Sequence, residues 1–197
     1  ATALYEELCE SVKISSYDSF NRYLKKELSK LPPQIQIRIP KVPGKEVEVD
    51  YSGDSIKIIS PSTGELINTE LFVGCLPNSE YIFAEFTFSQ KLEDFISSHC
   101  NMFEHFGGVP LFIVPDNAKV AVNKYHPYDP DINKTFHDMA THYGTGISPT
   151  RPRKPKDKPS VERAVGLIQQ HFFPLVRDKT FTSIGELNSE LKNWLNK

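Results

Sequence analysis

Three acidic side chains that are far apart in the chain stand where folding can gather them into one site. Asp50 lies in a stretch of alternating residues, Asp116 follows a short apolar run, and Glu162 lies at the start of a helical pattern. Carboxylates brought together repel, and one stays protonated unless a cation lies between them. Mg²⁺ and Mn²⁺ accept such oxygen ligands and keep positions open for phosphate and water. Two such ions activate an attacking oxygen and stabilise a leaving one at phosphorus, so we expect phosphodiester chemistry.

The stretch from residue 150 to residue 173 combines a basic arm with an amphipathic helix. Prolines exclude a helix in its first half, because each removes a backbone donor and favours an extended preceding residue. These prolines are Pro152, Pro155 and Pro159. In the second half, apolar residues recur at helical spacing. They are Val161, Val165, Ile168 and Phe172. The pattern predicts a packed helix that holds the Glu162 carboxylate next to the basic arm, and this arm is able to bind a polyanion.

Charge is segregated along the chain although the net charge is only −2. Residues 61–116 contain one basic residue, Lys91, whereas residues 151–163 are strongly basic. Basic side chains of this kind contact DNA phosphates and position the duplex without reading its sequence. Our candidates for these contacts are Lys119, Arg151, Arg153, Lys154, Lys156, Lys158 and Arg163.

Each acid also has a purely structural interpretation. Asp50 can be a sheet-edge acid with a hydrogen bond, Asp116 can cap a turn, and Glu162 can complement a helix dipole. Other acids near these positions are expected not to be metal ligands. They are Asp54, Asp138 and Asp157.

The elements that must position the acids follow from periodicity and turn residues. Alternation and turns predict strands at residues 47–51, 55–59, 65–76 and 80–88. A helix at 90–106, ended by Gly107 and Gly108, precedes a buried strand at 111–114. A helix at 131–143, a short strand at 145–148, the helix of Glu162 and a last helix at 183–195 complete the order. If the strands of Asp50 and Asp116 are neighbours in a mixed sheet, the helix of Glu162 can pack over both acids.

The chain before residue 45 has a different character from the rest. Residues 4–12 and 17–29 predict two short helices, and a helix-turn-helix reading of this pair is weak. Four prolines then predict an extended linker. We therefore divide the chain into a helical pair at 1–30, a linker at 31–44, a catalytic core at 45–178 and a C-terminal helix at 179–197.

Composition favours a soluble protein with a packed core. The 197 residues are 39% hydrophobic, and no apolar run is long enough to cross a membrane. The cysteines are far apart without metal-ligand spacing, which predicts reduced thiols in a cytoplasmic, nucleoid-associated bacterial protein. They are Cys9, Cys75 and Cys100. The histidines that we considered have no convincing ligand spacing either.

Four motifs around the acids resemble a known family. They read G-K-E-V-E-V-D-Y-S-G-D around Asp50, F-I-V-P-D-N-A-K-V-A-V around Asp116, T-H-Y-G at residues 141–144, and R-P-R-K-P-K-D-K-P-S-V-E around Glu162. Together they resemble the catalytic core of the IstA-type transposases of the insertion-sequence-21 family. These proteins fall within the acid-triad (DDE) transposases and retroviral-type integrases, and the resemblance covers most of the chain.

The resemblance implies a fold, a site and partners. The implied fold is α/β and ribonuclease H-like, with a mixed five-stranded sheet flanked by helices and a short N-terminal helical pair. The implied catalytic and metal-binding triad is Asp50, Asp116 and Glu162, with two Mg²⁺ or Mn²⁺ ions during catalysis. The implied activity is cleavage at transposon ends and transfer of the 3′ hydroxyl into target DNA. Self-association on DNA and an AAA+ ATPase helper of the IstB type are implied as well.

Two other functions stay open at this level. One is a catalytically inactive DNA-binding or assembly module derived from such a core. The other is a related integrase or ribonuclease H-type nuclease that acts on RNA–DNA hybrids, which requires contacts to 2′-hydroxyl groups.

Overall fold

A computed structural model describes residues 16–28, 41–115, 122–124, 131–149 and 159–197. Contacts divide the chain into two compact units, residues 1–39 and residues 40–197. In the first unit the predicted second helix is present as α2 (Tyr17–Leu28), whereas the helix predicted at residues 4–12 lies outside the described residues. Asp18 in the first turn of α2 and Lys25 and Lys26 in its last turn complement the helix dipole.

A mixed five-stranded sheet forms the centre of the second unit, as predicted. Its strands follow the order β5-β4-β1-β6-β9. They are β1 (Glu46–Tyr51), β4 (Glu70–Leu76), β5 (Tyr81–Thr87), β6 (Phe112–Pro115) and β9 (Gly146–Ile147). β1 pairs antiparallel with β4 and parallel with β6, so it lies at the middle of the sheet.

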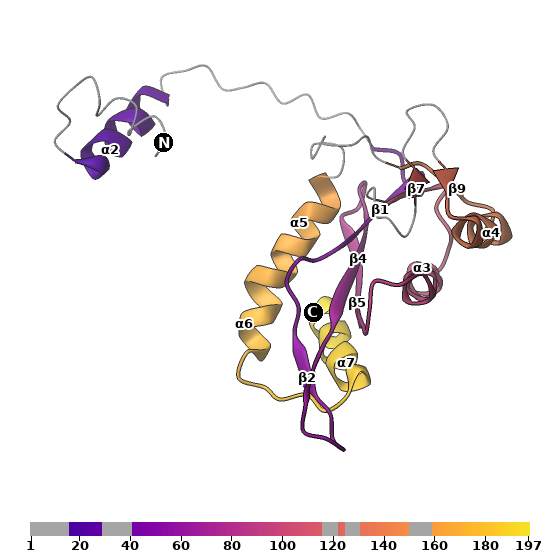
Figure 1. The fold of residues 1–197 in the computed structure, drawn as a ribbon. Helices are drawn as coiled ribbons and strands as arrows, with labels where there is room; N and C mark the ends of the chain where they lie inside the picture. Colours follow the sequence, from indigo (N-terminus) through magenta and orange to yellow (C-terminus); the bar gives the residue numbers. More distant parts are fainter. Residues whose placement is uncertain (1–15, 29–40, 116–121, 125–130, 150–158) are drawn as a thin grey trace. The chain divides into compact units, whose positions relative to one another are not determined.

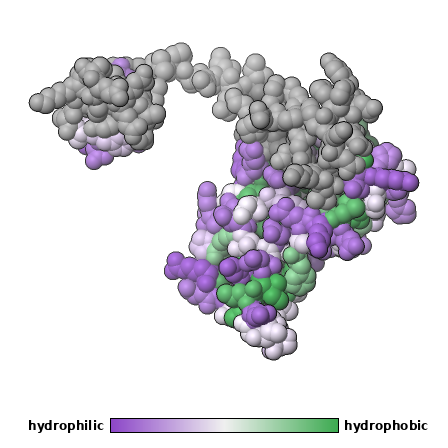
Figure 2. Space-filling model, viewed as in Figure 1, coloured by the Kyte–Doolittle hydropathy of each residue, from purple (hydrophilic) through white to green (hydrophobic). Residues whose placement is uncertain are grey.

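A separate hairpin contains one of the predicted strands, at residues 55–59, and the first part of another, at residues 65–76. β2 (Lys57–Ile59) pairs only with β3 (Leu66–Asn68) among the described strands, so residues 55–59 do not join the main sheet. The single strand predicted at 65–76 is divided at Thr69, which is buried and donates its hydroxyl to the Ile56 carbonyl. Alternation alone does not say which strand is the partner, and this explains the error. Figure 2 shows apolar side chains gathered toward this end of the unit, where Leu66 and Ile67 are exposed.

Helices cover both faces of the sheet (Figure 1). On one face lie α5 (Pro159–Leu167), α6 (Phe173–Val176) and α7 (Ile184–Leu195); on the other lie α3 (Leu92–Phe106) and α4 (Lys134–Tyr143). Alternate residues of β4 serve the two layers: Leu71 and Val73 pack toward α5 and α7, and Phe72 packs toward α3. The helical and strand periodicities therefore build two separate hydrophobic cores.

The ends of α3 and α4 have clear local causes. α3 ends at Gly107, whose φ of 67° is the left-handed conformation that glycine adopts without strain, as predicted. α4 begins later than predicted, because Asn133 caps it by accepting the N–H of Thr135 at 3.0 Å. The residues before this cap form β8 (Asp131–Ile132), which pairs with β7 (Val122–Lys124) instead of continuing the helix.

The predicted helix of Glu162 is interrupted by one π-helical turn. After α5 the chain forms η2 (Ile168–Phe172) and then α6. The predicted apolar stripe is confirmed, since Val161, Ile168 and Phe172 are fully buried and Val165 is half-buried against the same core. Pro174 lies at the start of α6, which follows the π-helical turn directly. Single π-turns occur often at functional sites.

Two cysteines are free thiols, as predicted. Cys75 is buried on β4, and burial raises the pKa of its thiol to about 12. Cys100 is half-buried on α3, and Cys9 lies outside the described residues.

In the part of the chain that the structure describes, no helix has both the length and the apolar character needed to cross a membrane.

His99 is a buried polar residue that the sequence patterns did not single out. It lies on α3 among aromatic rings, with ring centroids 4.4 Å from Phe95 and 5.2 Å from both Phe72 and Phe136. Its Nδ1 is 2.7 Å from the Phe95 carbonyl oxygen. Burial lowers the pKa of this imidazole to about 4, so His99 is neutral in the folded protein at physiological pH.

The buried imidazole predicts a loss of stability in mild acid. Between pH 6.5 and pH 4 the unfolded chain binds a proton at His99 that the folded chain does not, so the free energy of unfolding falls as the pH falls. Roughly 1.4 kcal/mol per pKa unit gives a total of about 3 kcal/mol. Urea unfolding at pH 7, 6 and 5 measures the slope. We expect His99→Leu to flatten it and His137→Gln, at an exposed position of α4, to leave it unchanged. Equal slopes for His99→Leu and the unmodified protein would contradict this account.

Candidate active site

Asp50 lies near the carboxyl end of the central strand β1. Its side chain is half-buried, and its Oδ1 accepts the N–H of Tyr51 at 2.9 Å. Asp50 pairs with Val73 across the antiparallel ladder, so the two side chains point to the same face of the sheet. Val73 packs in the core under α5 and α7. The carboxylate of Asp50 therefore belongs to the α5 face of the sheet.

The position of Asp116 lies directly after a described strand. β6 ends at Pro115, which pairs with Val49 in the parallel ladder. Asp50 and Asp116 are the next residues after this pair, and successive Cα atoms are about 3.8 Å apart. Asp116 itself lies outside the described residues, so its place in a site stays a prediction.

Glu162 is exposed on the first turn of α5. Its neighbours Val161 and Ala164 are buried in the core against β4, so they fix the helix while Glu162 points outward. A carboxylate in the first turn is also favoured by the helix dipole. The structure thus places Asp50 and Glu162 on the same face of the sheet.

Glu48 makes a contact that our sequence analysis missed. It is on β1, on the same face as Asp50, and is only 1% exposed. Its Oε2 accepts the N–H of Ser160 at 2.9 Å and the N–H of Val161 at 3.1 Å. A strand carboxylate therefore caps the start of the helix that carries Glu162. One sequence feature could have indicated this burial. When helices cover both faces of a sheet, an acidic residue of an alternating strand faces another element and not solvent.

Opposing effects act on the pKa of the Glu48 carboxyl group. Burial raises the pKa of its carboxyl group, whereas the N–H groups of Val161 and Ser160 and the nearby Lys41 ammonium lower it, and burial has the largest effect. Lys41 Nζ lies 3.8 Å from Glu48 Oε1 and also forms an ion pair with Glu46. Negative charge on this face of β1 is therefore partly balanced from the strand's own N-terminal side.

A second contact links β1 to the same helical segment. Gln169, in the π-helical turn η2, donates its side-chain amide to Ser52 Oγ at 2.9 Å and to Asp54 Oδ2 at 3.0 Å. Ser52 and Asp54 belong to the turn that follows β1. Asp54 was expected not to be a metal ligand, and the structure gives its carboxylate this other partner.

The predicted phosphate-binding residues lie mostly in parts of the chain that are not described. These are Lys119, Arg151, Arg153, Lys154, Lys156 and Lys158. Arg163 is described: it is exposed on α5 and forms an ion pair with the exposed Glu80. Such surface pairs stabilise a fold very little, so Arg163 can exchange this partner for a phosphate at small cost.

The described part of the site supplies hard oxygen ligands. Within the described ranges no three His, Cys, Asp or Glu side chains gather into a metal-binding group. Asp50 and Glu162 nevertheless share one face, and Mg²⁺ is commonly held by one or two carboxylates together with substrate phosphates. The acid Asp138 lies exposed on α4 on the opposite face, and Asp157 lies outside the described residues.

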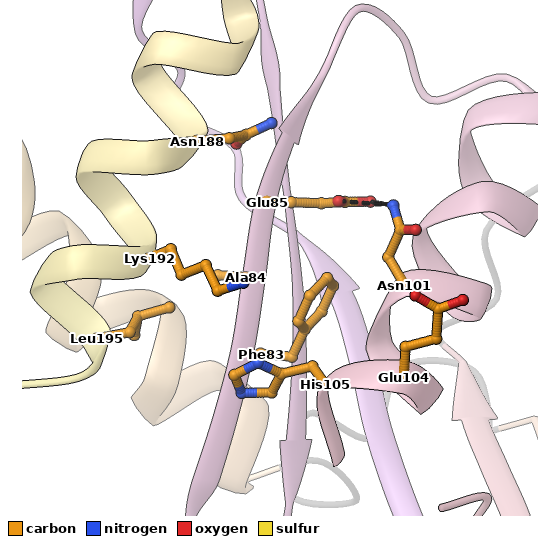
Figure 3. A pocket seen from close by; sticks show the side chains of 9 residues that line it. All are labelled: Phe83, Ala84, Glu85, Asn101, Glu104, His105, Asn188, Lys192 and Leu195. Atoms are coloured by element: carbon orange, nitrogen blue, oxygen red, sulfur yellow. Dashed lines mark hydrogen bonds between the residues drawn. The ribbon is translucent and has the colours of Figure 1, made fainter. Parts of the chain in front are cut away.

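A cavity of 440 Å³ lies elsewhere, at the outer strand β5. Figure 3 shows its walls, with Asn188, Lys192 and Leu195 from α7 facing Asn101, Glu104 and His105 from α3 across the strand. β4 separates β5 from β1, and the cavity lining includes neither Asp50 nor Glu162. It is therefore distinct from the acidic site.

Comparison with known proteins gives consistent relatives. No family model matches the chain. A protein of Sinorhizobium fredii named "Putative transposase y4uI" is 38% identical over 148 residues, which is 75% of this chain and 29% of that protein. The "Transposase for insertion sequence element IS21" of Pseudomonas aeruginosa is 31% identical over 150 residues, 76% of this chain and 35% of that protein. The chain therefore spans about a third of the length of these relatives.

Solved structures share the fold at low identity. The HTLV-2 integrase catalytic core domain in complex with magnesium superposes with a TM-score of 0.55 at 16% identity, covering 80% of this chain and 87% of that one. The catalytic core domain of BIV integrase gives a TM-score of 0.53 at 12% identity, covering 77% and 81%. At these identities the likeness establishes the fold alone.

The contact of Gln169 with the turn after β1 can be tested by stability. Gln169→Met keeps the size of the side chain but removes both hydrogen bonds, and we expect the free energy of unfolding to fall by about 1 kcal/mol. Urea unfolding at neutral pH measures the change. Gln170→Met, at the exposed neighbouring position, is the matched control and should change little. An equal effect of both substitutions would show that the contact contributes nothing specific.

Proposed function

This chain is a relative of the insertion-sequence transposases, that of IS21 included, with the fold of integrase catalytic cores, and on this premise we propose that it is the catalytic core of a DNA transposase. The proposed reaction has two steps. Hydrolysis at an element end exposes a 3′ hydroxyl, and that hydroxyl then attacks a phosphodiester bond of the target DNA. The chain acts as a polynucleotidyl transferase.

One observation supports this function most directly. The central strand β1 carries Asp50 on the face that α5 covers, and α5 carries Glu162 in its first turn. On the other side of β1, Val49 pairs with Pro115, the residue before Asp116. Thus α5, which carries Glu162, and the end of β6, which Asp116 follows in sequence, both lie beside β1. We propose Asp50, Asp116 and Glu162 as the catalytic triad.

The proposed triad suits hard divalent cations. Asp50 and Glu162 offer carboxylate oxygens, and the exposure of Glu162 leaves room for a phosphate beside it. Bound Mg²⁺ or Mn²⁺, two ions in the full site, would supply charge stabilisation for the attacking and leaving oxygens. The chain's own part would be to hold Asp50 on β1 and Glu162 on α5, with Asp116 supplied by the segment that follows β6, so that the reacting phosphate and the attacking oxygen meet in one orientation.

DNA and further protein copies are the proposed partners. The basic arm that leads into α5 would hold the phosphate backbone next to the acids, together with Lys119 and Arg163. Coordinated joining of two element ends requires at least two copies on DNA. A helper ATPase of the IstB type is part of this proposal for the whole protein.

Amide substitutions test the triad. We expect Asp50→Asn, Asp116→Asn and Glu162→Gln each to lower Mn²⁺-dependent nicking of a supercoiled plasmid by more than about 100-fold, the upper range for loss of an outer-shell metal partner. Circular dichroism checks that each variant stays folded. Asp138→Asn on α4 is the matched control and should retain activity.

If Asp116→Asn retains activity, the triad is wrong. If the unmodified chain binds DNA but shows neither nicking nor a Mn²⁺-induced rise in melting temperature, the catalytically inactive module is the better description. Preferential cleavage of an RNA–DNA hybrid would instead identify a ribonuclease H-type nuclease.

Salt dependence tests the arm. Each phosphate contact adds roughly 0.9 to the slope of log K against log salt concentration on duplex DNA. The double substitution Lys154→Gln and Lys156→Gln should therefore reduce the slope by up to about 1.8 and weaken binding to all sequences alike. Fluorescence anisotropy with a labelled duplex measures both. Lys57→Gln with Lys91→Gln removes the same charge from exposed positions outside the arm and should leave the slope nearly unchanged.

A further inference from the structure

We infer that Glu48 is a positioning residue for this reaction: by holding the first turn of α5, its carboxylate sets where Glu162 stands relative to Asp50. This inference rests on the proposed function of Asp50 and Glu162. It adds a residue that does not touch the reacting atoms and that acts through the helix.

The start of α5 depends on Glu48 for its hydrogen bonds. The first four N–H groups of a helix have no partner within the helix. At α5 the first of them is absent, because Pro159 has no N–H. Ser160 and Val161 both donate to Oε2 of Glu48, at 2.9 Å and 3.1 Å. The next residue is Glu162, so the proposed ligand follows directly on a turn that is anchored to β1.

A second contact, between Gln169 and Ser52, fixes how the helix is aligned along the strand. From Glu48 to Ser52 the chain advances four residues, about 13 Å at strand spacing. From Ser160 to Gln169 it advances nine residues, about 13.5 Å at helical spacing. Glu48 holds Ser160 and Ser52 holds Gln169, so α5 and η2 run beside β1 with matched lengths. Asp50 lies between these two anchors.

The chemistry of Glu48 favours this role over that of a metal ligand. Its Oε2 is already engaged by two N–H groups, and its side chain is 1% exposed beneath the helix start. Its Oε1 is buried without a hydrogen bond among the described residues and lies 3.8 Å from Lys41 Nζ. Burying a charge is costly, and an apolar side chain of similar size would fill the same space without that cost. What an apolar side chain cannot do is orient the two N–H groups of α5.

Three variants separate positioning from general stability. Glu48→Leu fills the space without an acceptor, and Glu48→Gln keeps an acceptor oxygen without the charge. Glu46→Gln is the matched control: it removes a carboxylate from the same face of β1, and one that also pairs with Lys41, but no described contact joins it to α5. All are measured on the full chain at a temperature where circular dichroism shows it to be folded.

The readouts are amide hydrogen exchange of residues 159–167, Mn²⁺ affinity by calorimetry, and kcat and KM for Mn²⁺-dependent nicking of supercoiled plasmid. For Glu48→Leu we expect faster exchange at Ser160 and Val161 and a Mn²⁺ affinity lower by about 10- to 100-fold. We also expect a reduced kcat with KM for the plasmid unchanged, because the basic arm is intact. Glu48→Gln should lie between Glu48→Leu and the unmodified chain, and Glu46→Gln should match the unmodified chain.

The outcomes distinguish this inference from the proposed function. Absence of Mn²⁺ binding and nicking in the unmodified chain overturns the proposed function, and with it the catalytic meaning of the contact. An active unmodified chain with Glu48→Leu unchanged in Mn²⁺ affinity and kcat overturns the inference alone, even if exchange is faster, because Glu48 is then only a structural cap. If Glu48→Leu does not fold, wild-type values of Mn²⁺ affinity and kcat in Glu48→Gln likewise overturn it.

Discussion

The arrangement of this protein depends on one buried carboxylate that joins a central strand to a helix more than a hundred residues later in the chain. Glu48 accepts two N–H groups from the first turn of α5, and that turn delivers Glu162 to the face of the sheet on which Asp50 lies. Side chains packed in a core fix a helix against a sheet, but they tolerate small sliding and rotation. A pair of hydrogen bonds to one oxygen atom tolerates much less, because bond strength falls steeply with distance and angle. The proposed chemistry requires that α5 move this little against β1.

The sheet surrounding this contact has different tasks on its two faces. The α3 face is built from aromatic rings, with His99 kept neutral among them, and neither Asp50 nor Glu162 lies on it. The α5 face combines an apolar core with the buried Glu48 and the half-buried Asp50. β1 serves both faces at once, because its valines point to α3 and its acids point to α5. One strand thus contributes to the stability of one layer and to the site on the other.

Much of this architecture could be predicted from the sequence, and the errors have identifiable physical causes. Helix α3 with its glycine end and the apolar stripe of α5 follow from periodicity and turn chemistry that act over short distances, whereas the mixed sheet around β1 was expected from the family resemblance. The strands at residues 55–59 and 65–76 were predicted without the separate hairpin that β2 and β3 form, because alternation identifies a strand but not its partner. α4 was started too early, because the cap at Asn133 was not recognised. The burial of Glu48 could have been inferred from its place in a sheet covered on both faces, but its hydrogen-bond donors lie more than a hundred residues away and no local pattern identifies them. For the candidate site, Asp50 and Glu162 are on the predicted elements, whereas Asp116 and most of the basic residues lie outside the described parts of the chain.

The long sequence separation of the Glu48 contact has a consequence for how the chain folds during synthesis. Residues 112 positions apart make this contact, so a ribosome has synthesised β1, α3 and β6 before it reaches Ser160. Until then Glu48 lacks the two N–H donors that it has in the folded chain. A chain shortened before residue 159 would therefore lack both Glu162 and the two N–H groups that Glu48 accepts.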